Sequence, residues 1–189
     1  QRALWTLLQA GVTTVVALAL GVPLAWVLQR LEFAARRWML KLVMLPFVVP
    51  TLVAALGVLA LLGPRGWLVQ VSGISLESGA WLLLYGNLFF NLSVVVRPAM
   101  AALAGVNATH MAAARALGAT PWRAFVRVEW PQIRAAVLGA GCLVFLYCFS
   151  GLGLALVLGG QQYATLEVEI YTLVAHELAL GQASVLALW

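Results

Sequence analysis

Four long stretches of this sequence contain no Asp, Glu, Lys or Arg, and they constrain the fold more than any other feature. They are 27, 23, 19 and 32 residues long and lie between Arg2 and Arg30, Lys41 and Arg65, Glu77 and Arg97, and Arg134 and Glu167. About 18 such residues are enough to cross a hydrocarbon core. Because the runs lack the two-residue alternation of barrel strands, they predict helices. We therefore expect an all-α, polytopic transmembrane protein.

The composition excludes a soluble fold and indicates one transmembrane domain over residues 1–189. The chain is 64% hydrophobic and only 9% charged, whereas soluble domains carry about 25% charged residues. The first two spans are expected at about Leu4–Leu28 and Leu40–Leu62, and a further apolar stretch follows Glu177. Since the sequence starts at Gln1 and that last stretch is short, we expect a longer polypeptide.

The basic residues predict the orientation, because cytoplasmic connections carry an excess of Lys and Arg. Nine of the eleven basic residues fall in two connections: Arg30, Arg36, Arg37, Lys41, Arg97, Arg115, Arg123, Arg127 and Arg134. Segments 30–41 and 97–134 are thus expected in the cytoplasm, and residue 1 and segment 159–177 outside. The net charge of +5 then reflects the membrane rim, so we expect no nucleic-acid partner.

Several features of the spans and the outer connections leave their role open. Pro46, Pro50 and Gly57 in the second span serve either packing or gating. Residues 63–78 are expected to form an external loop with Trp67 at the membrane interface. Three acidic residues either meet a soluble receptor or keep their loop solvated: Glu167, Glu169 and Glu177.

The connection from Val106 to Arg134 is the most informative one. Asn107 or Thr109 can cap a short Ala-rich helix that runs to Leu117, and Gly118 follows where a left-handed residue is favoured. A small-residue helix that ends in a sharp turn suits a groove on a partner protein.

A second short helix is predicted directly after this glycine. Thr120 is a suitable N-cap and Pro121 a suitable first helical residue, and Pro131 is expected to end the helix. Its apolar residues share one face and its two arginines another: Trp122, Phe125 and Val126, against Arg123 and Arg127. This pattern fits a surface anchor as well as a docking element.

The same residues resemble the binding-protein-dependent ABC importer permeases. That family carries a cytoplasmic motif that runs Glu-Ala-Ala, three residues, Gly, nine residues, Ile-x-Leu-Pro. Here residues 112–114 read Ala-Ala-Ala, Gly118 follows after three residues, and residues 128–131 read Val-Glu-Trp-Pro after nine more. Ala112 thus replaces the acidic residue of the family.

The resemblance implies a permease core of the type I importer class, with residues 106–131 as a coupling loop. It implies these ATPase-coupling residues: Ala112, Ala113, Ala114, Leu117, Gly118, Ala119, Pro121, Trp122 and Pro131. The implied partners are a cytoplasmic ATPase dimer, an extracytoplasmic solute-binding protein, a second permease half and the lipid bilayer. The implied location is the bacterial inner membrane, with ATP hydrolysed by a separate subunit.

Further segments resemble the thiamine and ferric-iron branch of the family. They include Leu158-Gly159-Gly160, Glu167 and Ile170-Tyr171, and the Val-Glu-Trp-Pro segment is closest to the thiamine permeases. The resemblance favours thiamine or a phosphorylated form as the solute, with ferric iron as the alternative. In this branch one chain often carries two copies of the core, and this one is similar to the first.

Other chemistry finds little support in the sequence. Asn87 and Asn91 share a helical face within the third span, where they either bond a neighbouring helix or line the translocation path. We find no phosphate-binding loop, nucleophile with its base or metal-ligand cluster, so we expect no catalysis, metal or cofactor.

Two other classes of function remain as alternatives. An ion-coupled secondary transporter would normally place ionisable residues inside its spans, and the four runs contain no Asp, Glu, Lys, Arg or His. A scaffold or an intramembrane enzyme would leave the elaborate cytoplasmic loop without a purpose.

Overall fold

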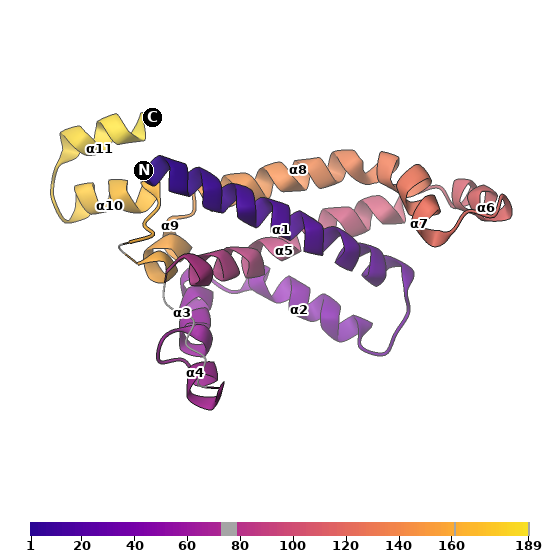
Figure 1. The fold of residues 1–189 in the computed structure, drawn as a ribbon, viewed down its shortest axis with the longest axis horizontal. Helices are drawn as coiled ribbons and strands as arrows, with labels where there is room; N and C mark the ends of the chain where they lie inside the picture. Colours follow the sequence, from indigo (N-terminus) through magenta and orange to yellow (C-terminus); the bar gives the residue numbers. More distant parts are fainter. Residues whose placement is uncertain (73–78, 161, 189) are drawn as a thin grey trace.

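Long helices lying side by side make up the body of the chain. The computed structural model describes residues 1–72, 79–160 and 162–188, and every regular element in them is helical. α1 (Arg2–Arg30), α5 (Ala80–Ala104) and α8 (Trp130–Phe149) pack on one another along the long axis (Figure 1). Four stretches are long and apolar enough to cross a membrane: Arg2–Arg30, Thr51–Val71, Ala80–Ala104 and Pro121–Phe149. The predicted all-α membrane class is confirmed.

Small residues bring the three long helices close together. Ala10, Ala17 and Ala25 on α1 are fully buried, and a Cβ at Gly21 would lie 2.7 Å from Val95 Cγ1 on α5. Close backbone approach of this kind is how helices associate in lipid, where burial from water supplies no driving force. The opposite side of α1 exposes large apolar side chains such as Val15, as a lipid-facing surface does.

The predicted second span is wrong, because it consists of two helices. α2 (Arg36–Val48) and α3 (Thr51–Leu62) are separated at Val49 and Pro50 and run in different directions (Figure 1). Pro50 has no N–H for a helical bond to the Pro46 carbonyl, and Val49 before it adopts an extended conformation. Part of the predicted external loop is helical as α4 (Trp67–Ser72), and its residues 73–78 lie outside the described residues.

The predicted fourth span is likewise shorter than its uncharged run. α8 ends at Phe149, and the chain turns at Ser150 and Gly151. A Cβ at Gly151 would lie 2.7 Å from the Tyr147 carbonyl oxygen, so this turn requires glycine. The short α9 (Leu152–Leu154) and the π-helix η2 (Ala155–Gly159) then pack on α3 and α5.

Pro131 does not end the second loop helix, contrary to our prediction. α7 (Pro121–Ala124) continues through the π-helix η1 (Phe125–Glu129) directly into α8, where Pro131 lies in the first turn. The Trp130 N–H bonds the Phe125 carbonyl five residues back, and this wider turn accommodates a proline that lacks an N–H. The helix of the third span extends past its uncharged run, because α5 continues through Arg97 to Ala104. Arg97 therefore lies on α5 and not in the connection.

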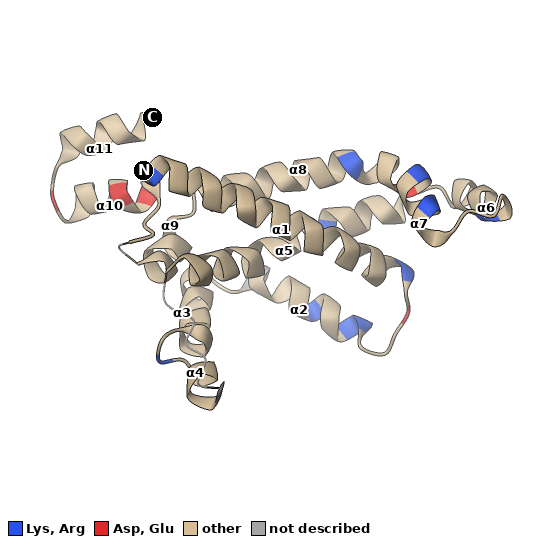
Figure 2. Cartoon of the chain, viewed as in Figure 1, with Lys and Arg blue, Asp and Glu red and all other residues tan. Residues whose placement is uncertain are grey.

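The charged residues divide between the two ends of the bundle. Most Lys and Arg residues lie toward the end that carries α7 and α6 (Ala108–Ala116), and Glu167 and Glu169 lie on α10 (Leu166–Ala175) at the other (Figure 2). The short α11 (Leu180–Ala187) packs on α10. The structure thus separates the two groups of charges on which the predicted orientation depends.

A buried carboxylate fastens η1 to the end of α1. Glu129 is 1% exposed, its Oε1 accepts from the guanidinium of Arg30, and its Oε2 accepts from Trp26 Nε1 at 2.8 Å. Both oxygens of the buried charge are therefore paired, as a charge removed from water requires. This contact holds the base of the loop against the first span.

We expect Arg30→Gln to destabilise the protein, because it leaves the Glu129 carboxylate buried and without its counter-charge. Loss of one partner of a buried pair costs about 3–5 kcal/mol. Arg30→Gln combined with Glu129→Gln removes both charges and should recover much of that loss. The measurement is thermal unfolding in detergent, with Arg37→Gln, an exposed arginine near the same end, as the control. A double variant no more stable than the single one would contradict the pairing.

Candidate functional site

The helix α6 and the turn after it form a protruding tip at one end of the molecule. None of the α6 residues is buried, and the Leu117 side chain that follows is 89% exposed. The Asn107 side chain caps the helix by accepting from the Thr109 N–H at 2.8 Å, which confirms one of the two predicted caps. An exposed leucine on a small-residue helix presents an apolar surface to whatever covers this tip.

Gly118 ends α6 in the left-handed conformation that we predicted. Its φ is +77°. The Gly118 N–H bonds the Arg115 carbonyl at 2.9 Å, and the Ala119 N–H bonds the Ala114 carbonyl at 3.0 Å. These two bonds constitute a Schellman motif, which fixes the turn and satisfies the last carbonyls of the helix. No atom lies within 4 Å of a Cβ placed at Gly118, so the backbone alone demands glycine.

Aromatic side chains support the base of the tip. Thr120 caps α7 through a 3.4 Å bond from the Arg123 N–H, with Pro121 as the first helical residue. The Trp122 ring stacks on Phe125 with centroids 5.8 Å apart, and Phe125 meets the edge of Trp26 on α1 at 6.4 Å. Trp122 remains 72% exposed, so it supports the tip and also extends its apolar surface.

The predicted coupling residues lie in one continuous segment, from α6 through the first turn of α8. All but Ala114 and Ala119 are exposed, and those two are half-buried in the turn. Sequence reasoning missed three residues that hold the segment to α1, namely Trp26, Arg30 and Glu129. The available signal was Glu129 itself, the one acidic residue of segment 97–134.

A second candidate site is a cavity of about 510 Å³ beside α5. It lies against both helix breaks, and its wall comprises Pro46, Val49, Thr51, Asn87, Phe90, Asn91, Val94, Tyr147 and residues 150–154. Backbone left unpaired at membrane depth is tolerated only inside protein or along a water-filled space. The coincidence of two breaks with one cavity satisfies that condition.

Asn87 and Asn91 bond neighbouring helices, which is one of the two roles that the sequence left open, and they also line this cavity. Asn87 Nδ2 donates to Gln9 Oε1 on α1 at 2.9 Å, and Gln9 Nε2 donates to the Cys148 carbonyl on α8 at 2.7 Å. Asn91 Nδ2 donates to the Asn87 carbonyl at 2.9 Å and to Cys148 Sγ at 3.3 Å. Gln9 thereby joins three helices, a role that sequence reasoning missed.

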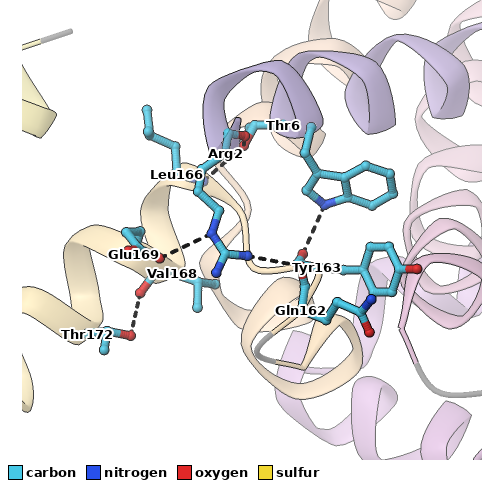
Figure 3. Close-up of polar contacts among 9 residues, drawn as sticks. Arg2, Thr6, Gln162, Tyr163, Leu166, Val168, Glu169 and Thr172 are labelled. Carbon is cyan, nitrogen blue, oxygen red and sulfur yellow. Dashed lines mark hydrogen bonds and ion pairs between the residues drawn. The ribbon is translucent and has the colours of Figure 1, made fainter.

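At the opposite end from the tip, the start of α1 binds the segment before and within α10 (Figure 3). Arg2 Nη1 donates to the Gln162 carbonyl at 3.0 Å, and Arg2 Nε lies 3.5 Å from Glu169 Oε2. Trp5 Nε1 donates to the Tyr163 carbonyl at 2.9 Å. The buried Thr6 hydroxyl accepts from the Leu166 N–H at 2.9 Å. Residue 1 and segment 162–169 thus lie together, as a common side of the membrane requires.

Glu167 lies in the first turn of α10, next to this group of contacts. Partial burial raises the pKa of its carboxyl above the ordinary value, because desolvation disfavours the charged form. Glu169 nearby is paired with Arg2. The Arg2 guanidinium thus pairs with the Glu169 carboxylate, and burial makes the Glu167 carboxyl less ready to ionise.

A solved structure shares the whole fold. A chain from the crystal structure of a bacterial ABC transporter involved in the import of the acidic polysaccharide alginate matches with a TM-score of 0.83 and 17% sequence identity. The match covers 99% of this chain and 71% of that one. At this identity the similarity concerns the fold.

The relatives found by sequence are transport permeases. The thiamine transport system permease protein ThiP of Haemophilus influenzae is 33% identical over 187 residues, and that of Escherichia coli 31%; the matches cover 95% of this chain and 35% of each relative. A probable molybdenum ABC transporter permease protein of Haloferax volcanii is 34% identical over 86% of this chain and 60% of its own length. The chain spans about a third of the length of the thiamine relatives. The family described as binding-protein-dependent transport system inner membrane component matches residues 17–189. The chain therefore belongs to that family.

Proposed function

We propose that this chain forms one half of the translocation path of an ATP-driven importer, with α6 and its glycine turn as the element that docks on a separate ATPase. The observation that carries the proposal is the rigid, exposed tip: Leu117 is 89% exposed, while the Schellman motif at Gly118 fixes the backbone beneath it. Without a partner, exposing such an apolar tip to water would only destabilise the protein. A mere membrane anchor would not need a defined turn.

The proposed mechanism is alternating access driven from the tip. The Glu129 contacts with Trp26 and Arg30 join the loop to α1, so movement of the docked tip is carried to the first span as well as to α8. The far end of α1 bonds the segment before α10, which we propose to face a solute-binding protein outside the inner membrane. A second permease half, in the same polypeptide or a second copy, completes the path.

We propose thiamine or a phosphorylated form as the solute. The support is the 33% identity to a thiamine permease along nearly the whole chain. Ferric iron remains the alternative from the sequence resemblance, and the molybdenum permease relative adds molybdate as a further substrate to test. An ion-coupled transporter is less well supported, because no Asp, Glu, Lys or Arg is among the described residues that line the cavity.

We expect Gly118→Asp to weaken docking of the ATPase. Asp and Asn adopt the left-handed conformation more readily than other side chains, so Gly118→Asn is a control of equal size without charge. An unpaired carboxylate between Leu117 and the partner should weaken ATPase binding by about tenfold or more, and Asn much less. The measurement is co-purification of the ATPase with the full-length permease from membranes, with uptake as a second readout. Equal binding by the Asp variant and the unaltered protein would exclude this tip as the docking element.

The solute is tested by uptake into proteoliposomes that contain the full-length permease and its ATPase. Solute-binding proteins loaded with thiamine, ferric iron or molybdate are added in turn, and ATP hydrolysis is followed together with uptake. We expect thiamine alone to stimulate hydrolysis and to accumulate. Stimulation by iron or molybdate would contradict thiamine as the solute but would still support an ATP-driven importer. A permease that binds no ATPase would contradict the importer proposal itself.

A further inference from the structure

The orientation of two amide side chains determines what the cavity beside α5 offers to a solute. A backbone carbonyl can only accept a hydrogen bond, so Gln9 must direct its NH₂ group to the Cys148 carbonyl and its Oε1 to Asn87. Asn87 must therefore direct its own NH₂ group to Gln9. Asn91 is fixed in the same way, because its NH₂ group donates to the Asn87 carbonyl.

Both asparagines consequently keep an Oδ1 acceptor, and Asn87, which uses one of its two N–H groups, also keeps a donor. Neither Oδ1 is among the buried side-chain atoms of the described residues that lack a partner, which are Thr13 Oγ1 and Thr165 Oγ1. Since the two asparagines line the cavity and three of their four N–H groups already donate to protein, the cavity meets mainly acceptor oxygens from them. A solute that fits these atoms must donate hydrogen bonds or carry positive charge.

The rest of the wall agrees with this selection. No Lys, Arg or His is among the described lining residues, so an anion would find no counter-charge. The last carbonyls of α2 and the first N–H groups of α3 meet at the same break, and their partial charges offset each other. The same offset holds at the second break, where the last carbonyls of α8 meet the first N–H groups of α9. Phe90 and the half-exposed Tyr147 offer aromatic surface, which attracts cations and flat rings.

We propose that this cavity is a binding site on the solute path for an organic cation that carries N–H donors. A volume of about 510 Å³ is within the range of ligand pockets. The inference rests on the proposed function in one respect only, that the cavity belongs to the path. Thiamine, a cation with an amino group, falls in this class, and the molybdate anion does not.

The test labels a cysteine in the cavity wall with two thiol reagents of opposite charge. Ser150→Cys is made in the full-length permease after Cys142→Ala, Cys148→Ser and replacement of every cysteine elsewhere in the full-length chain. The probes are methanethiosulfonates with a trimethylammonium or a sulfonate group. The ratio of the labelling rate of the cationic reagent to that of the anionic reagent is compared with the same ratio at Ser184→Cys, an exposed position on α11 away from the cavity. This reference corrects for the intrinsic reactivity of the two reagents.

We expect the cationic reagent to be favoured at Ser150→Cys about tenfold more than at the reference position. Asn91→Leu should bring the ratio down toward the reference value, and Asn91→Asp should raise it. Ser93→Ala, a buried change on the same helix outside the cavity wall, should leave it unchanged. The Asp variant keeps the test decisive where the Leu variant is too unstable to purify.

Three outcomes would overturn the site: a ratio equal to the reference, a preference for the anionic reagent, or no modification by either reagent. The labelling needs no substrate, solute-binding protein or ATP. A permease that fails to import thiamine can therefore still show the cationic preference, and one that imports thiamine can still lack it. The two proposals fail separately.

Discussion

The need to pair every backbone polar group inside a membrane governs the architecture of this chain. A long helix pairs its own groups, so α1, α5 and α8 can face lipid along most of their length. The two breaks, at Val49–Pro50 and Ser150–Gly151, cannot do so. Both border the cavity beside α5, an arrangement that allows unpaired backbone groups to meet water in place of lipid. The cavity and the broken helices are thus two consequences of a single constraint.

α1 connects the two ends of the molecule because its polar contacts are made at its ends and once along its length. Its 29 residues span about 44 Å at 1.5 Å per residue. Trp26 and Arg30 bond Glu129 at one end, Arg2, Trp5 and Thr6 bond segment 162–169 at the other, and Gln9 bonds α5 and α8 between them. Directional bonds at both ends of a helix oppose its sliding, so we expect a displacement of the loop to reach segment 162–169.

The sequence predicted the helical membrane fold and the loop turn because both depend on local rules. An uncharged run predicts a span, and Gly118 before Thr120 and Pro121 predicts a turn between helices. The breaks were missed because hydropathy does not distinguish a straight span from two apolar helices joined by Pro50 or Gly151. Glu129, Arg30 and Gln9 were missed because their partners lie 78 to 139 residues away, and no periodicity in one sequence encodes such a contact.

The cavity lies between the three long helices and the shorter helices α3 and α9–η2, and this position determines which motions reshape it. α1, α5 and α8 are held together by buried small residues and by the Gln9 network. α3 and the α9–η2 segment pack on one another and on the start of α5, and they are connected to the long helices through the two breaks. A change of angle at a break alters the cavity without opening the three-helix core, whereas a change within the core would expose Gln9 and Asn87 unpaired to lipid. The low-cost motions of this fold are therefore those that reshape the space where Asn87 and Asn91 lie.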